Sequence, residues 1–137
     1  MGDRRQSREL ALCFLFFFDA AKADQKEDLI EFCSLNKEKL TKHIKPFFLK
    51  IVKGVIDDSK KIDSLLKKHS KHWKISRMPI VDRNIMRIAV FEFLKCSDIP
   101  SCVSINEAIE IGKKYGTKDS GSFINGVLDQ VKQFSEI

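Results

Sequence analysis

The sequence predicts an all-α fold of about seven helices, and three observations lead to that expectation. No segment shows the sustained alternation of apolar and polar residues that marks a half-buried strand. Apolar residues recur instead at intervals of three and four, and several of these runs follow a Ser or Asp that suits a helix cap. The third observation is that residues 80–94 are apolar on nearly every side of a helix.

The helix at residues 80–94 is predicted to be the buried centre of the fold. From Ile85 onward, only Arg87 and Glu92 interrupt its apolar surface. A helix that is apolar all round is a buried helix. Pro79 suits the start of the helix, and Asp82 in the first turn matches the helix dipole. We therefore expect the other helices to pack around this one.

The first helix is predicted to begin with a capping box in which Asp3 caps the helix and Gln6 reaches back. Its expected core stripe is Leu10, Cys13, Phe14, Phe17 and Ala21. The opposite face carries Arg5, Leu12 and Phe16, with Arg8 and Glu9 beside them. This face brings guanidinium groups next to an aromatic ring, although Phe16 could equally meet a second layer of helices.

The middle of the chain contains two further helix starts. Asp24 opens a second capping box, and its helix should run to about Ser34. Pro46 suits an early helical position, and the stripe that accompanies it is Ile44, Phe47, Phe48, Ile51, Val52 and Val55. Asp57, Asp58 and Ser59 form a stretch that could cap another helix, which would carry Ile62, Leu65 and Leu66. The pattern leaves open whether residues 46–70 form one kinked helix or two.

Two helices are expected near the C-terminus. Pro100 bars the residue before it from a helix, so residues 96–100 should be a loop. Ser104 opens a third capping box, Gly116 should end that helix as a left-handed cap, and Asp119 should cap the last helix. The last stripe is Phe123, Ile124, Val127, Leu128 and Val131. Gly112 and Gly126 lie mid-helix, where close approach of another backbone would offset the cost of glycine.

The chain of 137 residues carries a net charge of +6 that is unevenly spread. The excess lies at Arg4, Arg5 and Arg8 and between residues 37 and 77. Such asymmetry points to an acidic partner, with RNA as the first candidate, while the lysines of residues 60–71 are more consistent with a solvated surface. The four cysteines form no C-x-x-C pair and no apolar run spans a membrane, so we expect a cytoplasmic protein without a metal.

Five blocks of the sequence together resemble the NusB family of bacterial transcription antitermination factors. They are R-R-Q-S-R-E from Arg4, V-D-R-N-I-M-R-I-A from Val81, D-I-P from Asp98, I-N-E-A-I-E from Ile105 and Y-G-T-K-D-S-G-S-F-I-N-G-V-L-D from Tyr115. The C-terminal blocks are specific in order and spacing. The resemblance covers nearly the whole chain and is thinnest at residues 22–45.

The resemblance implies one RNA-binding domain over residues 1–137, built from two small helical bundles that meet near residues 77 and 78. It implies binding of boxA RNA together with NusE, a protein of the small ribosomal subunit. The pair would join other Nus factors on RNA polymerase and promote read-through of ribosomal RNA operons. It implies no enzymatic activity and no cofactor. Family members include monomers and dimers, so a homodimer stays open.

The resemblance also implies site residues. The family's arginine-rich RNA-binding motif falls on Arg4, Arg5 and Arg8, and its RNA-contacting aromatic residue, usually tyrosine, falls on Phe16. The acidic residue facing NusE and RNA falls on Asp82, and Asp119 and Phe123 border both partners. Phe16 lacks the tyrosine hydroxyl, and Gln6 and Ser7 interrupt the arginines. Both differences should weaken RNA binding by the protein alone, so binding should depend more on NusE. Phe123 also fits a core position.

Two alternatives belong to other functional classes. One is a helical scaffold or dimer that binds proteins without touching RNA. The other is the RNA-binding fragment of a ribosomal RNA methyltransferase, because the same helical unit occurs in such enzymes. The chain ends at Ile137 without a glycine-rich cofactor motif, which disfavours the second alternative. Asn106, Glu107 and Asn125 fit capping and buried hydrogen bonds better than catalysis.

Overall fold

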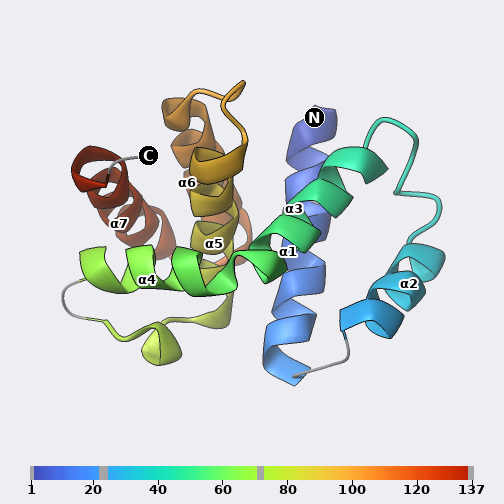
Figure 1. Ribbon diagram of the computed structural model, residues 1–137, viewed down its shortest axis with the longest axis horizontal. Helices are drawn as coiled ribbons and strands as arrows, with labels where there is room; N and C mark the ends of the chain where they lie inside the picture. The colour runs from blue at the N-terminus through green and yellow to red at the C-terminus, as the bar shows by residue number, and fades with distance from the viewer. Residues whose placement is uncertain (1, 22–24, 71–72, 136–137) are drawn as a thin grey trace. The chain divides into compact units, whose positions relative to one another are not determined.

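The computed structural model describes residues 2–21, 25–70 and 73–135 (Figure 1). This part of the chain forms seven α-helices and one short 3-10 helix and contains no strand, which confirms the all-α class. The elements are α1 (Asp3–Ala21), α2 (Gln25–Leu35), α3 (Lys45–Asp57), α4 (Ser59–His69), η1 (Ile75–Arg77), α5 (Ile80–Lys95), α6 (Ser101–Tyr115) and α7 (Ser120–Phe134). The predicted cap at Asp24 lies outside the described residues. No described helix is long and apolar enough to cross a membrane.

The chain divides into two compact units, Met1–Lys53 and Gly54–Ile137, here called unit 1 and unit 2. The division falls within α3, earlier than the boundary expected near residues 77 and 78. The reason is that α4 packs against α5 and α7 and so belongs with the C-terminal helices.

Unit 1 is held together by a cluster of phenylalanines. Phe14 of α1 meets Phe32 of α2 edge-on, with ring centroids 5.5 Å apart. Phe32 stacks on Phe48 of α3 at the same distance of 5.5 Å, with the ring planes 10° apart. The Ser7 hydroxyl donates to the Ile44 carbonyl at 2.9 Å and ties α1 to the segment before α3. These contacts join three helices around aromatic rings.

The predicted core stripe of α1 is wrong in part. Its buried residues are Ser7, Arg8, Glu9, Ala11, Leu12, Phe14 and Leu15. Cys13 is exposed, and Phe17 is 53% exposed. The sequence from Leu10 to Phe18 is apolar on two faces, so helical spacing alone could not show which face is buried.

The start of α1 also differs from the prediction. Asp3 is already the first helical residue, and the Gln6 amide donates to the Gly2 carbonyl at 3.1 Å. Gly2 therefore occupies the cap position that the sequence predicts for Asp3. Asp3 still lies in the first turn, where its charge suits the helix dipole.

Helix α5 is the buried centre of unit 2, as predicted. It has 16 residues, and its buried members are Asp82, Asn84, Ile85, Met86, Ile88, Ala89, Val90, Phe91 and Glu92. Glu92, one of the two polar exceptions, is 1% exposed and accepts a hydrogen bond of 2.8 Å from the Ser104 hydroxyl of α6. Pro79 occupies the cap position just before the helix.

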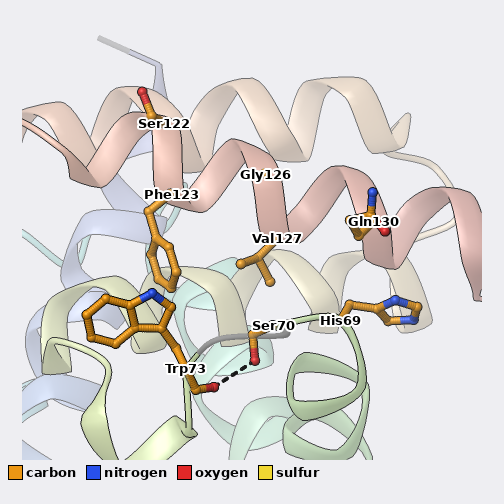
Figure 2. Close-up of a pocket in the computed structure, with 8 residues that line it drawn as sticks. All are labelled: His69, Ser70, Trp73, Ser122, Phe123, Gly126, Val127 and Gln130. Carbon is orange, nitrogen blue, oxygen red and sulfur yellow. Dashed lines mark hydrogen bonds between the residues drawn. The ribbon is translucent and has the colours of Figure 1, made fainter.

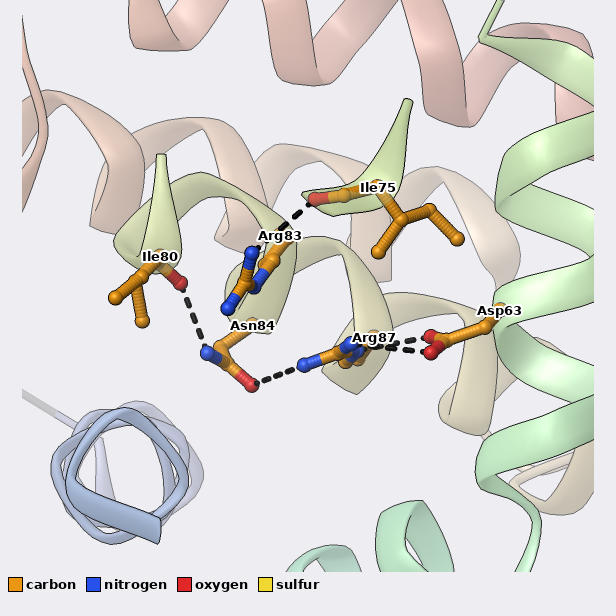
Figure 3. A network of polar contacts seen from close by, with 6 residues as sticks. All are labelled: Asp63, Ile75, Ile80, Arg83, Asn84 and Arg87. Atoms are coloured by element: carbon orange, nitrogen blue, oxygen red, sulfur yellow. Dashed lines mark hydrogen bonds and ion pairs between the residues drawn. The ribbon is translucent and has the colours of Figure 1, made fainter. Parts of the chain in front are cut away.

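Arg87, the other polar exception, anchors a network shown in Figure 3. Its guanidinium group binds both carboxylate oxygens of Asp63 in α4, at 2.8 and 3.0 Å. It also donates to the Asn84 side-chain oxygen at 3.2 Å, and Arg83 donates to the Ile75 carbonyl in η1 at 3.2 Å. These residues of the V-D-R-N-I-M-R block thus fix α4 and η1 to α5.

The structure resolves residues 46–70 into two helices, α3 and α4, which are separated at Asp58. Asp58 holds the cap position without a side-chain hydrogen bond. Gly54, near the end of α3, is required by close packing. A Cβ atom there would lie 2.0 Å from Phe91 Cε1.

Several predictions about α6 and α7 need correction. The helix begins at Ser101 after Pro100, so Ser104 is its fourth residue and is buried instead of capping the helix. Gly116 has an extended backbone (φ −95°, ψ −158°) and is not a left-handed cap. The close neighbour of Gly112 is a side chain and not a backbone, since a Cβ there would lie 2.6 Å from Ile124 Cδ1 and 3.9 Å from the Gly121 amide nitrogen, and Gly126 faces open space.

Candidate nucleic-acid and partner interface

The arginines at the start of α1 differ in how far they reach solvent. Arg4 is exposed, Arg5 is half-buried, and Arg8 is only 3% exposed. The guanidinium carbons of Arg4 and Arg8 lie 5.0 and 5.4 Å from the centroid of the Phe47 ring. Both distances are within the range of cation–π attraction. The Phe47 ring therefore packs against the guanidinium groups at the start of α1.

Sequence reasoning missed this role of Phe47, which it placed in a core stripe. The available signal was the Phe47–Phe48 pair at the start of α3, because successive helical residues point in different directions. Phe48 is fully buried in the core, whereas Phe47 is half-buried. One ring of the pair fills the core and the other meets the arginines.

Phe16 lies farther along α1 and is 41% exposed. Part of its ring can therefore be reached by a ligand. Leu12 is only 4% exposed, so the predicted continuous face through Arg5, Leu12 and Phe16 is interrupted. The arginine cluster and the aromatic ring are two separate accessible points on α1.

In unit 2, Phe123 of α7 lines a groove of about 370 Å³ (Figure 2). The lining residues are His69, Ser70, Trp73, Ser122, Phe123, Gly126, Val127 and Gln130. The Phe123 and Trp73 rings meet edge-on, with centroids 6.0 Å apart, and Trp73 is 49% exposed. Phe123 thus borders both solvent and the packed part of unit 2.

One wall of this groove is fixed at the end of α4. The Ser70 hydroxyl donates to the Trp73 carbonyl at 3.0 Å, and His69 Nε2 lies 2.9 Å from the Ser135 hydroxyl oxygen. Burial lowers the pKa of His69, and the nearby Lys68 adds to that effect. Gly126 leaves the α7 side of the groove open, since nothing lies within 4 Å of the position its Cβ would take.

Asp119 and Asp82 lie in different environments. Asp119 is exposed and holds the cap position of α7 without a side-chain hydrogen bond. Asp82 is 3% exposed, and its Oδ1 accepts a bond of 2.7 Å from the Ser120 hydroxyl. Of these two predicted partner residues, the structure places Asp119 at the surface and Asp82 in the interior of unit 2.

The fold defines a class of small all-helical proteins with a cationic, aromatic first helix. Comparison with known proteins makes the assignment specific, because the model described as the NusB family matches residues 5–133. The chain belongs to the NusB family, as the sequence blocks predicted.

Individual relatives agree with this assignment. The transcription antitermination protein NusB of Desulforapulum autotrophicum is 56% identical over 137 residues, which is 100% of this chain and 96% of the relative. The solved structure of T. maritima NusB has a TM-score of 0.82 at 35% identity, covering 93% of this chain and 89% of that chain. A crystal structure of antitermination factors NusB and NusE in complex with dsRNA has a TM-score of 0.84 at 26% identity, covering 96% of each chain.

Proposed function

We propose that this protein is a transcription antitermination factor that binds boxA-type RNA together with NusE and promotes read-through of ribosomal RNA operons. The observation that carries the proposal is the 56% identity, over the full chain, to a transcription antitermination protein. A structural neighbour that contains NusB, NusE and double-stranded RNA supports the choice of partners.

The RNA contacts are assigned to α1. Arg4 and Arg5 reach solvent at a helix N-terminus, where the positive end of the helix dipole favours phosphate. The exposed part of Phe16 can stack on an unpaired base, as aromatic side chains do in single-stranded RNA recognition. Arg8 is buried against Phe47, so its proposed contribution is to hold the cluster in place and add positive potential.

The NusE contacts are assigned to the start of α7. Asp119 offers an exposed carboxylate, and Phe123 offers part of an aromatic ring beside the half-exposed Trp73. A charged rim next to a partly buried aromatic anchor is a common arrangement at protein interfaces. Asp119 and Phe123 are also proposed to border the RNA, as the family resemblance implies.

In the cell, the protein would act in the cytoplasm as a binding factor without an enzymatic step or cofactor. The RNA-bound pair would join other Nus factors on RNA polymerase. Three arginines and one aromatic ring make a small RNA footprint, and one of the arginines is buried. NusE should therefore increase the affinity for RNA by enlarging the contact surface.

The test is a titration of labelled boxA RNA with the protein, in the presence and absence of NusE from the same organism. A scrambled RNA of equal length and composition is the control. Tighter binding of boxA RNA than of the control, strengthened by NusE, is the expected result. Equal affinity for both RNAs under both conditions would contradict the proposal.

Binding should also have a functional consequence. A purified transcription reaction containing RNA polymerase, the other Nus factors and a boxA-bearing template should read through a terminator more often when this protein is added. A template with the scrambled boxA should show no increase.

A further inference from the structure

The carboxylate of Asp82 is bound inside unit 2, at the point where three helix ends meet. Asp82 lies in the first turn of α5 and is 3% exposed. The Ser120 hydroxyl, on the first residue of α7, donates to its Oδ1 at 2.7 Å, and Ser120 is 1% exposed. A short hydrogen bond to a carboxylate is stronger than one between neutral groups.

The same Ser120 hydroxyl also controls the turn between α6 and α7. The Thr117 amide donates to Ser120 Oγ at 2.9 Å. A hydroxyl has one proton to donate and lone pairs to accept with, so both bonds form together. Ser120 thus links the backbone of the turn at Thr117 to the carboxylate of Asp82.

Gly116, the last residue before this turn, makes room for the arrangement. A Cβ atom at Gly116 would lie 2.2 Å from Ser120 Oγ and 2.8 Å from the Gly112 carbonyl oxygen. Any side chain there would displace the Ser120 hydroxyl. Because the Gly116 backbone is extended, the requirement is for space and not for an unusual dihedral angle.

Two candidate partner residues are attached to this turn. Asp119 directly precedes Ser120, and Phe123 follows it by three residues, so both take their positions from the start of α7. We infer that Asp82 is a positioning residue. It fixes the turn through Ser120 and so holds Asp119 and Phe123 in place for NusE, without touching the partner itself. This inference rests on the proposed function.

The molecule provides a matched control for a buried carboxylate. Glu92, also on α5, accepts a bond of 2.8 Å from the Ser104 hydroxyl, and the two residues are 1% and 2% exposed. The chemistry and burial match those of Asp82 and Ser120, and both carboxyl groups belong to α5. Ser104 is the fourth residue of α6, however, and no candidate partner residue adjoins it.

The test is a double-mutant cycle on NusE binding, with Asp82→Asn, Ser120→Ala and the double variant, all in the full chain. Each single variant should weaken NusE binding by at least about fivefold, the lower limit of typical site-to-site coupling. The double variant should have the same NusE affinity as the single variant that binds less tightly. Both changes break the same hydrogen bond between Asp82 and Ser120, so their effects should not add. Gly116→Ala should behave in the same way.

Glu92→Gln and Ser104→Ala should lower the melting temperature while leaving NusE affinity within a factor of two of the wild type, by our estimate for a site uncoupled from the partner. Hydrogen exchange supplies a second measurement. The Thr117 amide should exchange faster in Asp82→Asn and Ser120→Ala, and at the wild-type rate in Glu92→Gln.

Three results would overturn the inference. The first is unchanged NusE affinity in folded Asp82→Asn, and the second is an unchanged exchange rate of the Thr117 amide. The third is a double variant whose loss of affinity equals the product of the two single losses. Multiplying losses would mean that Asp82 contacts the partner directly. Failure of the wild-type protein to bind NusE would instead overturn the proposed function, so the two failures are distinguishable.

Discussion

The start of α1 and the start of α7 each present functional candidates, but they hold their charged groups differently. At α1, Arg4 lies at the surface over Phe47 and its charge faces solvent. At the start of α7, the carboxyl group of Asp82 in α5 is buried and bound by Ser120, while Asp119 is exposed. In the roles proposed above, the α1 site uses its charges for contact, whereas the α7 site uses a buried carboxyl group to shape the surface that makes contact.

The largest effect is expected from a charge placed in the buried helix α5. It tests whether unit 2 has the rigid centre on which the start of α7 depends. Ile88 of α5 is 4% exposed, so Ile88→Asp would bury an unpaired carboxylate. We expect a loss of more than about 4 kcal/mol and no cooperative thermal transition by circular dichroism. Ile30→Asp is the control, because Ile30 is 67% exposed and its replacement should change stability by less than about 0.5 kcal/mol.

Two glycines test how tightly unit 2 is packed. In Gly54→Ala the new methyl group would overlap the buried Phe91 ring, which should cost about 1–3 kcal/mol of unfolding free energy. In Gly126→Ala the methyl group meets open space, so the variant should gain up to about 1 kcal/mol from helix propensity. Denaturant titrations of both variants measure the difference. Equal effects would show that the packing around Gly54 is looser than described.

The contact role of the α1 site is tested by the salt dependence of RNA binding. Arg4→Ala and Arg5→Ala should each weaken binding and reduce the salt slope by about one phosphate contact. Phe16→Ala should weaken binding by roughly 1–3 kcal/mol with little change in slope, because stacking releases no counterion. Arg8→Ala should lower stability, because it removes a buried contact with Phe47.

The control for these variants is Lys60→Ala, which removes one exposed positive charge from α4. Its RNA affinity should stay close to that of the wild type. Deletion of residues 2–8 should abolish most RNA binding. If it leaves affinity unchanged, the arginines are a solvated surface and the contact role of α1 is wrong.

The next prediction concerns Phe123, which fits both a core and a partner role. Phe123→Ala should weaken NusE binding while the protein stays folded, because the ring is only half-buried. The lost edge-on contact with Trp73 should cost about 0.5–1.5 kcal/mol of stability. Phe134→Ala is the control, since Phe134 is 62% exposed near the other end of α7. A large fall in melting temperature with unchanged NusE affinity would assign Phe123 to the core.

The smallest expected effect is a pH dependence at the groove. The pKa of His69 is lowered in the folded protein, mainly by burial, so the unfolded chain binds the proton more readily. The stabilising contribution is complete above the unfolded pKa of about 6.5 and is lost as the pH falls through the lowered folded value. Denaturation midpoints should therefore fall less between pH 7.5 and pH 5 in His69→Gln than in the wild type, by an amount we estimate as small for a partly exposed group. Identical pH profiles would contradict this.

Much of the fold could be predicted from the sequence, because helical spacing and proline positions are local signals. The centre at α5 and the loop before Ser101 followed from such signals. The buried face of α1 did not, because a helix with two apolar faces leaves the choice to its neighbours. Ser104 matched a capping box in sequence, yet its hydroxyl serves a buried carboxylate twelve residues earlier in the chain.

The candidate site was predictable in its composition but not in its geometry. The arginines and Phe16 were identified from residue type and order, and the accessibility of Arg4 and Phe16 fits the predicted role. The burial of Arg8 over Phe47 depends on how α3 approaches α1, which no local pattern encodes. The burial of Asp82 likewise depends on Ser120, which is 38 residues away in the chain.

The contact between Arg4 and the Phe47 ring also affects the conformational entropy of RNA binding. A free arginine side chain samples many rotamers, and holding it in one of them costs up to about 2 kcal/mol. The guanidinium group of Arg4 already packs against an aromatic ring in the unbound protein, so fewer rotamers are lost when RNA binds. Lysine would keep the charge at this position but would lose the planar group that stacks. The Arg4→Lys variant should therefore bind RNA more weakly than the wild type, although its net charge is unchanged.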